Sequence, residues 1–92
     1  MANTKSARKM IRVAERRRQR NKAIRSAVRT FVKKAERAIY TDVANSTESV
    51  IAAIRALDRA VTKGVLHRNN AARRKSRLMK KLNRAKAAVA AS

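Results

Sequence analysis

The stretch KGVLHRNNAARRKSRLMKKL, at residues 63–82, combines a turn signal with a strongly amphipathic helix pattern. Gly64 is the only glycine of the chain, and glycine readily takes the backbone conformation that ends a helix. We therefore predict a turn at Gly64, between two helices. After it, apolar residues recur at spacings of three and four, the period of one helix face. They are Ala71, Leu78, Leu82, Ala85 and Val89, with Ala72 beside them and Met79 interpreted as core filler.

Basic residues occupy the opposite side of the same helix, on an arc about 120° wide. No acidic residue interrupts this arc, so its charge is purely positive. One side of the helix is predicted to pack against protein, and the other suits a densely anionic partner. The basic residues of the arc are Arg73, Arg74, Arg77, Lys80, Lys81 and Arg84.

Length and charge limit the possible classes of protein. The 92 residues form one small domain with a modest core. Lys and Arg number 26 against 5 Asp and Glu, which gives a formal net charge of +21. Such a charge opposes compaction and favours a polyanion as partner, with nucleic acid the first candidate and an anionic membrane surface the second.

Composition also predicts an all-α fold. Proline is absent, while alanine, arginine and lysine, which are good helix formers, are abundant. There is no cysteine, hence no disulfide. The longest apolar runs, VIAAI at 50–54 and AAVAA at 87–91, have five residues each, too few for a transmembrane helix or a secretory signal. We therefore expect a cytoplasmic protein with no membrane partner.

Residues 1–22 carry nine basic residues and one acidic residue, Glu15. A helix that is charged on nearly all sides buries little, so we predict a basic arm that is frayed when free and helical along an anion. A solvated, disordered tail is the alternative. Three residues are candidates for the helix N-cap: Asn3, Thr4 and Ser6.

From Ala23 onward the helix pattern becomes regular. Together with the arm it predicts one helix of roughly 36 residues, about 54 Å long, whose first half projects beyond the core. Its far side carries Arg29, Lys33 and Arg37. Its apolar face comprises Ile24, Val28, Phe31, Ala35 and Ala38, with Val32 and Ile39 beside them.

The polar residues 41–49 predict the first connection, and Asn45 with Glu48 resembles a capping box. The helix that follows has a single apolar face, so the simplest fold is an antiparallel three-helix bundle spanning 23–92. The apolar face of this second helix comprises Val50, Ile54, Leu57 and Val61, and the residues expected near the middle of the bundle are Phe31, Leu57, Leu78 and Leu82. After Leu82 the helix pattern weakens, and we expect the tail to fray.

Charge is distributed unequally among the three predicted helices. Residues 41–60 have a net charge of −1, whereas residues 1–40 carry +12 and residues 61–92 carry +10. Basicity serving only solubility would be spread over all three helices. The pattern instead predicts that the first and third helices flank a nucleic-acid surface and that the second faces away from it.

No catalytic site can be assembled from the sequence. There is one histidine, no cysteine, and the five carboxylates are scattered, so neither an acid–base pair nor a metal cluster forms locally. We predict a non-enzymatic protein without cofactor, metal or small-molecule substrate. His67, Asn69 and Asn70 at the start of the third helix are either donors to phosphate or base, or residues that hold the turn.

Phe31 and Tyr40 are the only aromatic residues, too few to stack the bases of single strands. We therefore expect recognition of the backbone and shape of folded RNA by Arg and Lys, with a steep salt dependence.

Three stretches resemble the bacterial small-subunit ribosomal protein S20 family: MANTKSARK at 1–9, RNKAIRSAVRTFVKK at 20–34 and KGVLHRNNAARRKSRLMKKLN at 63–83. The resemblance covers about residues 1–40 and 61–83. It implies a three-helix protein of the small ribosomal subunit that binds 16S ribosomal RNA directly, in its 5′ domain and 3′ minor domain. It also implies a role in early subunit assembly, with other ribosomal proteins contacted at most peripherally.

The RNA-binding residues that the resemblance implies lie in three groups. In the arm they are Lys5, Arg8, Lys9, Arg12, Arg16, Arg17, Arg18, Arg20 and Lys22. In the rest of the first helix they are Arg25, Arg29, Lys33 and Lys34. In the third they are His67, Arg68, Asn69, Asn70, Arg73, Arg74, Lys75, Ser76, Arg77, Lys80 and Lys81.

Two other classes of protein fit part of the pattern. A DNA-binding helix-turn-helix protein would use the turn at Gly64 and read bases with Asn69 and Asn70. Against it, the outer face offers mainly phosphate ligands, and the arm is longer than the motif needs. A membrane-surface protein would lay its basic amphipathic helices on anionic lipid, but the apolar faces are rich in alanine and lack tryptophan.

Overall fold

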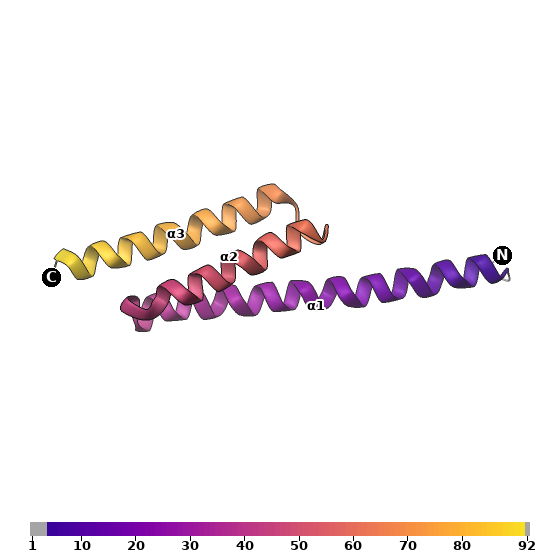
Figure 1. Cartoon of the computed structure of the whole chain (residues 1–92), viewed down its shortest axis with the longest axis horizontal. Helices are drawn as coiled ribbons and strands as arrows, with labels where there is room; N and C mark the ends of the chain where they lie inside the picture. Colours follow the sequence, from indigo (N-terminus) through magenta and orange to yellow (C-terminus); the bar gives the residue numbers. More distant parts are fainter. Residues whose placement is uncertain (1–3, 92) are drawn as a thin grey trace.

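The computed structural model describes residues 4–91 as three α-helices and one short 3₁₀ turn, without a β-strand in that range. The elements are α1 (Lys5–Thr41), η1 (Val43–Asn45), α2 (Ser46–Thr62) and α3 (Arg68–Ala91). Successive helices run antiparallel, and α2 and α3 pack with the C-terminal part of α1 (Figure 1). The predicted all-α fold, a three-helix bundle with a long first helix, is confirmed.

The first helix extends well beyond the bundle. It has 37 residues, which corresponds to about 56 Å. All of its buried residues, Val28, Ala35 and Ile39, lie in its C-terminal half, while the N-terminal half projects past the other helices (Figure 1). The radius of gyration is accordingly 18.4 Å, against about 12 Å for a compact domain of this length.

The start of α1 is fixed by Thr4. Its side-chain oxygen accepts a hydrogen bond from the backbone N–H of Ala7 at 3.2 Å, which satisfies one of the free donors at the helix N-terminus. Ser6, a second candidate, lies inside the helix, and Asn3 lies outside the described residues. The arm is helical from Lys5; its fraying in the free protein stays a prediction.

The first connection is shorter than the sequence suggests. We predicted it at 41–49, but α2 already begins at Ser46. Ser46 is buried, and its hydroxyl donates a hydrogen bond to the carbonyl of Val43 at 2.8 Å. This hydrogen bond links η1 to the start of α2. The predicted capping box is wrong. The Asn45 side chain caps nothing and instead donates to Asp42 Oδ2 at 2.8 Å.

The second connection turns at Gly64, as predicted. Gly64 has φ +73°, the left-handed conformation that glycine adopts without steric cost. Its N–H donates to the carbonyl of Val61, and the N–H of Val65 donates to that of Ala60, both at 2.9 Å. This pair of hydrogen bonds is a Schellman motif, which satisfies the last carbonyls of α2 and directs the chain toward α3.

The core is built largely from small residues. Ala53, Ala56 and Ala60 of α2 are buried together with Leu57 and Val50. Side chains of this size let the helices approach closely. Leu78 and Leu82 of α3 are buried as predicted.

Three large apolar residues, and the small Ala72, lie farther out than the pattern indicates. Phe31, expected near the middle, is 38% exposed, because its ring sits at the edge of the α1–α2 contact beside Ile24 and Ala56. Met79 is 40% exposed and is therefore not core filler. Val89 is also exposed, although α3 continues as helix to Ala91.

Candidate nucleic-acid interface

The basic residues of the arm are all exposed. The nine lysines and arginines between Lys5 and Lys22 surround a helix that contacts no core. The single carboxylate among them, Glu15, lies 4.0 Å from Arg18 in a loose, solvent-exposed pair. The arm therefore presents positive charge on nearly every side of a rod.

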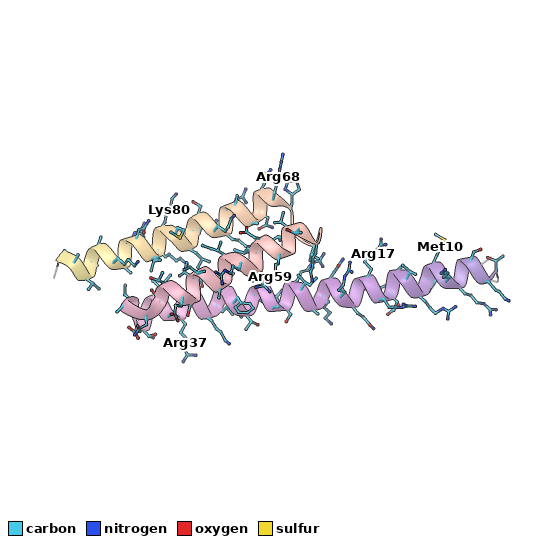
Figure 2. All side chains as sticks on the ribbon, in the orientation of Figure 1. Met10, Arg17, Arg37, Arg59, Arg68 and Lys80 are labelled. Atoms are coloured by element: carbon cyan, nitrogen blue, oxygen red, sulfur yellow. The ribbon has the colours of Figure 1, made fainter. Side chains whose placement is uncertain are left out.

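Within the bundle, basic side chains project from both outer edges. Arg68 and Lys80 extend from α3 away from the other two helices, whereas Arg37 extends from α1 at the opposite edge (Figure 2). Arg73 and Arg77 on α3 are exposed as well. This arrangement presents two basic surfaces that point in different directions.

Two of the predicted RNA-binding lysines are engaged in contacts between helices. Lys75 Nζ lies 2.8 Å from Asp58 Oδ1 and joins α3 to α2. Lys81 Nζ lies 3.2 Å from Glu36 Oε1 and joins α3 to α1. All four side chains remain partly exposed. Part of the charge of these lysines is therefore offset within the protein, unlike that of their neighbours.

The seam between α1 and α3 contains two hollows. One, of about 250 Å³, lies at the end where α2 turns into α3 and is lined by Arg25, Arg29, Asn70 and Arg74 around an apolar floor. The other, of about 800 Å³, lies toward the C-terminal ends of α1 and α3. It is lined by Lys33, Glu36, Arg37, Ile39, Tyr40, Lys81, Arg84, Ala85 and Ala88.

His67 holds the start of α3. Its Nδ1 accepts a hydrogen bond from the N–H of Asn69 at 3.1 Å, and its carbonyl accepts from Ala71. Of the two roles left open for His67, the structure shows the one at the helix junction. Asn70 instead accepts a hydrogen bond from Arg74 Nε at 3.0 Å, so it orients a neighbouring guanidinium.

The second helix contributes little positive charge. Arg55 and Arg59 are exposed on α2, but Glu48 and Asp58 on the same helix offset them. Lys34 on α1 and Ser76 on α3, both predicted to bind RNA, are also exposed. The structure therefore keeps the charge asymmetry of the sequence, with α1 and α3 basic and α2 nearly neutral.

Neither a metal centre nor a membrane span is found in the described range. Among residues 4–91 no group of three or more His, Cys, Asp or Glu side chains is placed to hold a metal ion. In the same part of the chain, no helix combines the length and apolar character that crossing a bilayer requires.

Comparison with known families gives a match over residues 2–83, to the family described as Ribosomal protein S20. The chain belongs to the ribosomal protein S20 family. The match includes the arm, the rest of α1, the nearly neutral α2 and the part of α3 up to Asn83. It confirms the resemblance seen in the sequence, and membership of a family of ribosomal proteins confirms a non-enzymatic protein.

Similar proteins carry the name small ribosomal subunit protein bS20. The one from a Roseiflexus species is 59% identical over 88 residues, covering 96% of this chain and 97% of the relative. The one from Carboxydothermus hydrogenoformans is 54% identical over 84 residues, 90% of each chain. The one from Corynebacterium diphtheriae is 52% identical over 85 residues, covering 91% of this chain and 98% of the relative.

Sequence reasoning missed the seam hollows, both interhelical ion pairs and the buried Ser46. Each depends on which flank of a helix meets its neighbour, and periodicity gives only the centre of an apolar face. The acidic residues offered a partial signal, because an isolated carboxylate in a chain this basic has many potential partners.

Proposed function

We propose that the protein is a structural component of the bacterial small ribosomal subunit. It binds 16S ribosomal RNA directly through exposed basic residues of α1 and α3 and helps the subunit assemble. Its partners are the 5′ domain and the 3′ minor domain of that RNA, with other ribosomal proteins contacted at most peripherally. Its place is the ribosome, in the cytoplasm. The names carried by its relatives support the ribosomal part of this proposal.

The distribution of charge is the observation that carries RNA binding. A net charge of +21 on 92 residues is concentrated on two of three helices and on exposed side chains. Nucleic-acid phosphates are the partner that such a surface suits, because neutralising them releases condensed counterions. With only two aromatic residues, one of which lies at the edge of the core, base stacking contributes little.

The shape supports contact with more than one segment of RNA. The molecule measures 69 × 21 × 15 Å, and its basic edges point in different directions. An arm comprising residues 1–22 is suited to lie along RNA, while the bundle of residues 23–92 contacts other phosphates. Neutralising phosphates that belong to separate RNA segments would hold those segments together.

Binding to 16S ribosomal RNA at several salt concentrations tests this proposal. The triple variant Arg73→Ala, Arg77→Ala, Lys80→Ala removes exposed charges of α3 that have no carboxylate partner among residues 4–91. We expect weaker binding and a salt slope that is lower by about 2 to 3, at about 0.7 to 0.9 per phosphate contact. The double variant Arg55→Ala, Arg59→Ala on α2 is the control, and it should change the affinity and the salt slope less.

Three further results would contradict the proposal. One is a triple variant with unchanged affinity and slope. Another is failure of the protein to sediment with small ribosomal subunits in moderate salt. The third is preference for duplex DNA, or for anionic liposomes in the presence of excess RNA, because each would favour one of the alternative classes.

A further inference from the structure

The smaller hollow on the α1–α3 seam is lined by side chains from three parts of the chain. Arg25 and Arg29 come from successive turns of α1, and Asn70 and Arg74 from the first two turns of α3. Its apolar floor is formed by Val28, Ala60, Val65 and Leu66. Packing of the α2–α3 turn against α1 thus brings three guanidinium groups around a space of about 250 Å³.

The charge of this hollow suits an anion. None of its lining residues is acidic, so three positive charges converge without an internal counter-ion. The N-terminus of α3, which carries the positive end of the helix dipole, lies at the same place. Both lysines paired with carboxylates are absent from the lining. The convergence of like charges costs free energy until an anion is bound.

One guanidinium in the hollow is oriented by a hydrogen bond to a neighbouring side chain. Arg74 Nε donates to Asn70 Oδ1 at 3.0 Å, one helical turn away, which leaves its two terminal nitrogens for another partner. An arginine presents paired N–H donors that match two oxygens of a phosphate. The asparagine therefore acts as a positioning residue for the Arg74 guanidinium.

We propose that this hollow binds a single backbone phosphate of RNA, held between Arg25 and Arg29 of α1 and Arg74 of α3. The proposal rests on the proposed function and adds a defined anchor to a surface otherwise made of independent charges. A phosphate bound here contacts both basic helices at once. It therefore fixes the position of the RNA along the seam and draws α3 toward α1.

A double-mutant cycle on Arg29 and Arg74 tests the shared ligand. Each single change to alanine should weaken binding to 16S ribosomal RNA by about 10- to 100-fold. The fold-loss of RNA affinity in the double variant should be smaller than the product of the two single losses, because both residues hold the same phosphate. Arg73→Ala on the outer face removes the same charge and should cost about fivefold or less. Circular dichroism checks that each variant keeps its helices.

A charge-neutral variant separates orientation from net charge. Asn70→Ala leaves the charge at +21 but frees the Arg74 side chain. We expect a loss of RNA affinity of about three- to tenfold with an unchanged salt slope. Asn83→Ala, an exposed asparagine of α3 outside the hollow, is the matched control and should bind like the unmodified protein.

Free phosphate must be distinguished from RNA as the source of the anion. Inorganic phosphate should raise the melting temperature more than chloride at equal ionic strength, and Arg74→Ala should abolish the difference. If phosphate protects the protein but Arg74→Ala binds RNA as Arg73→Ala does, the site takes a free anion and the RNA assignment is overturned. The site itself is overturned if the losses of RNA affinity in the Arg29→Ala and Arg74→Ala variants are additive and Asn70→Ala leaves the affinity unchanged. The proposed function is tested separately: it fails if the triple variant of Arg73, Arg77 and Lys80 binds RNA with unchanged affinity and salt slope.

Discussion

Lys81 Nζ on α3 lies 3.2 Å from Glu36 Oε1 on α1, and this pair joins two helices across 45 residues of sequence. The corresponding pair on the other flank of α3, Lys75 with Asp58, joins it to α2. Exposed pairs of this kind contribute about 0 to 1 kcal/mol each. The two pairs matter more for the charge of α3 than for stability. They offset the charge of Lys75 and Lys81, and the other basic residues of α3 stay available to bind RNA.

Replacing the acidic partner of Lys81 should strengthen RNA binding. Glu36→Gln removes a negative charge from the seam and releases the lysine, so affinity should rise a few-fold while the free energy of unfolding changes by less than about 1 kcal/mol. Filter binding and thermal melting measure the two quantities. Glu48→Gln on α2 removes the same charge away from the seam and should have a smaller effect. Weaker RNA binding by Glu36→Gln would show that the pair is needed to position the interface.

The core should be sensitive at Leu57. This side chain is fully buried between the helices, so Leu57→Ala should lower the free energy of unfolding by about 2 to 5 kcal/mol. Urea denaturation measures the loss, with RNA absent. Ile51→Ala on the same helix is the control, because Ile51 is 43% exposed and should cost clearly less. Equal losses at the two positions would contradict the observed packing.

The turn at Gly64 should tolerate only residues that accept a positive φ. A Cβ at this position would meet no atom within 4 Å, so any cost of substitution is one of backbone conformation. We expect Gly64→Ala to lower the free energy of unfolding by about 1 to 2 kcal/mol and Gly64→Asn to cost less. Thermal melting of both variants provides the comparison, and a more costly asparagine would exclude this explanation.

The arm should exchange its amide hydrogens much faster than the bundle. Its helix buries no residue before Val28, so few tertiary contacts stabilise residues 4–22 in the free protein. Hydrogen exchange measured by mass spectrometry should show rapid exchange there and protection in α2. Binding to 16S ribosomal RNA should slow exchange in the arm. Strong protection of the free arm would mean that it is a stable helix before binding.

The sequence was sufficient to predict those helices whose apolar faces are wide and regular. Val50, Leu57, Leu78 and Leu82 lie where the period places them, and Gly64 turns as expected. The single glycine and the absence of proline left few places where the chain can turn. The same reasoning located the projecting half of α1, because a helix charged on all sides has no face to bury.

Other features depend on side-chain contacts that the apolar period does not encode. Phe31 fits the apolar period, but its ring lies at the edge of the α1–α2 contact, while alanines of α2 occupy buried positions. Asn45 precedes α2 as a capping residue would, yet Asp42 takes its side chain. The first outcome depends on tertiary packing and the second on a local hydrogen bond between residues three apart, and the apolar spacing encodes neither of them.

The site was predicted as a set of basic residues rather than as a geometry. Exposure of the arm and of the outer face of α3 follows directly from the absence of apolar residues there. The hollow lined by Arg29 and Arg74 could not be predicted in this way, because all of α2 separates the two residues in the chain. Its position is set by the α2–α3 turn packing against α1.

Short-range photocrosslinking tests the central claim most directly, namely that α1 and α3 face the RNA and α2 does not. The chain has no cysteine, so one engineered cysteine can carry the probe uniquely. Gln19→Cys on the arm, Ser76→Cys on α3 and Ile51→Cys on α2 are all exposed positions. In complexes with 16S ribosomal RNA, the first two should crosslink to RNA and Ile51→Cys should not. Efficient crosslinking from α2, with none from α3, would contradict the account.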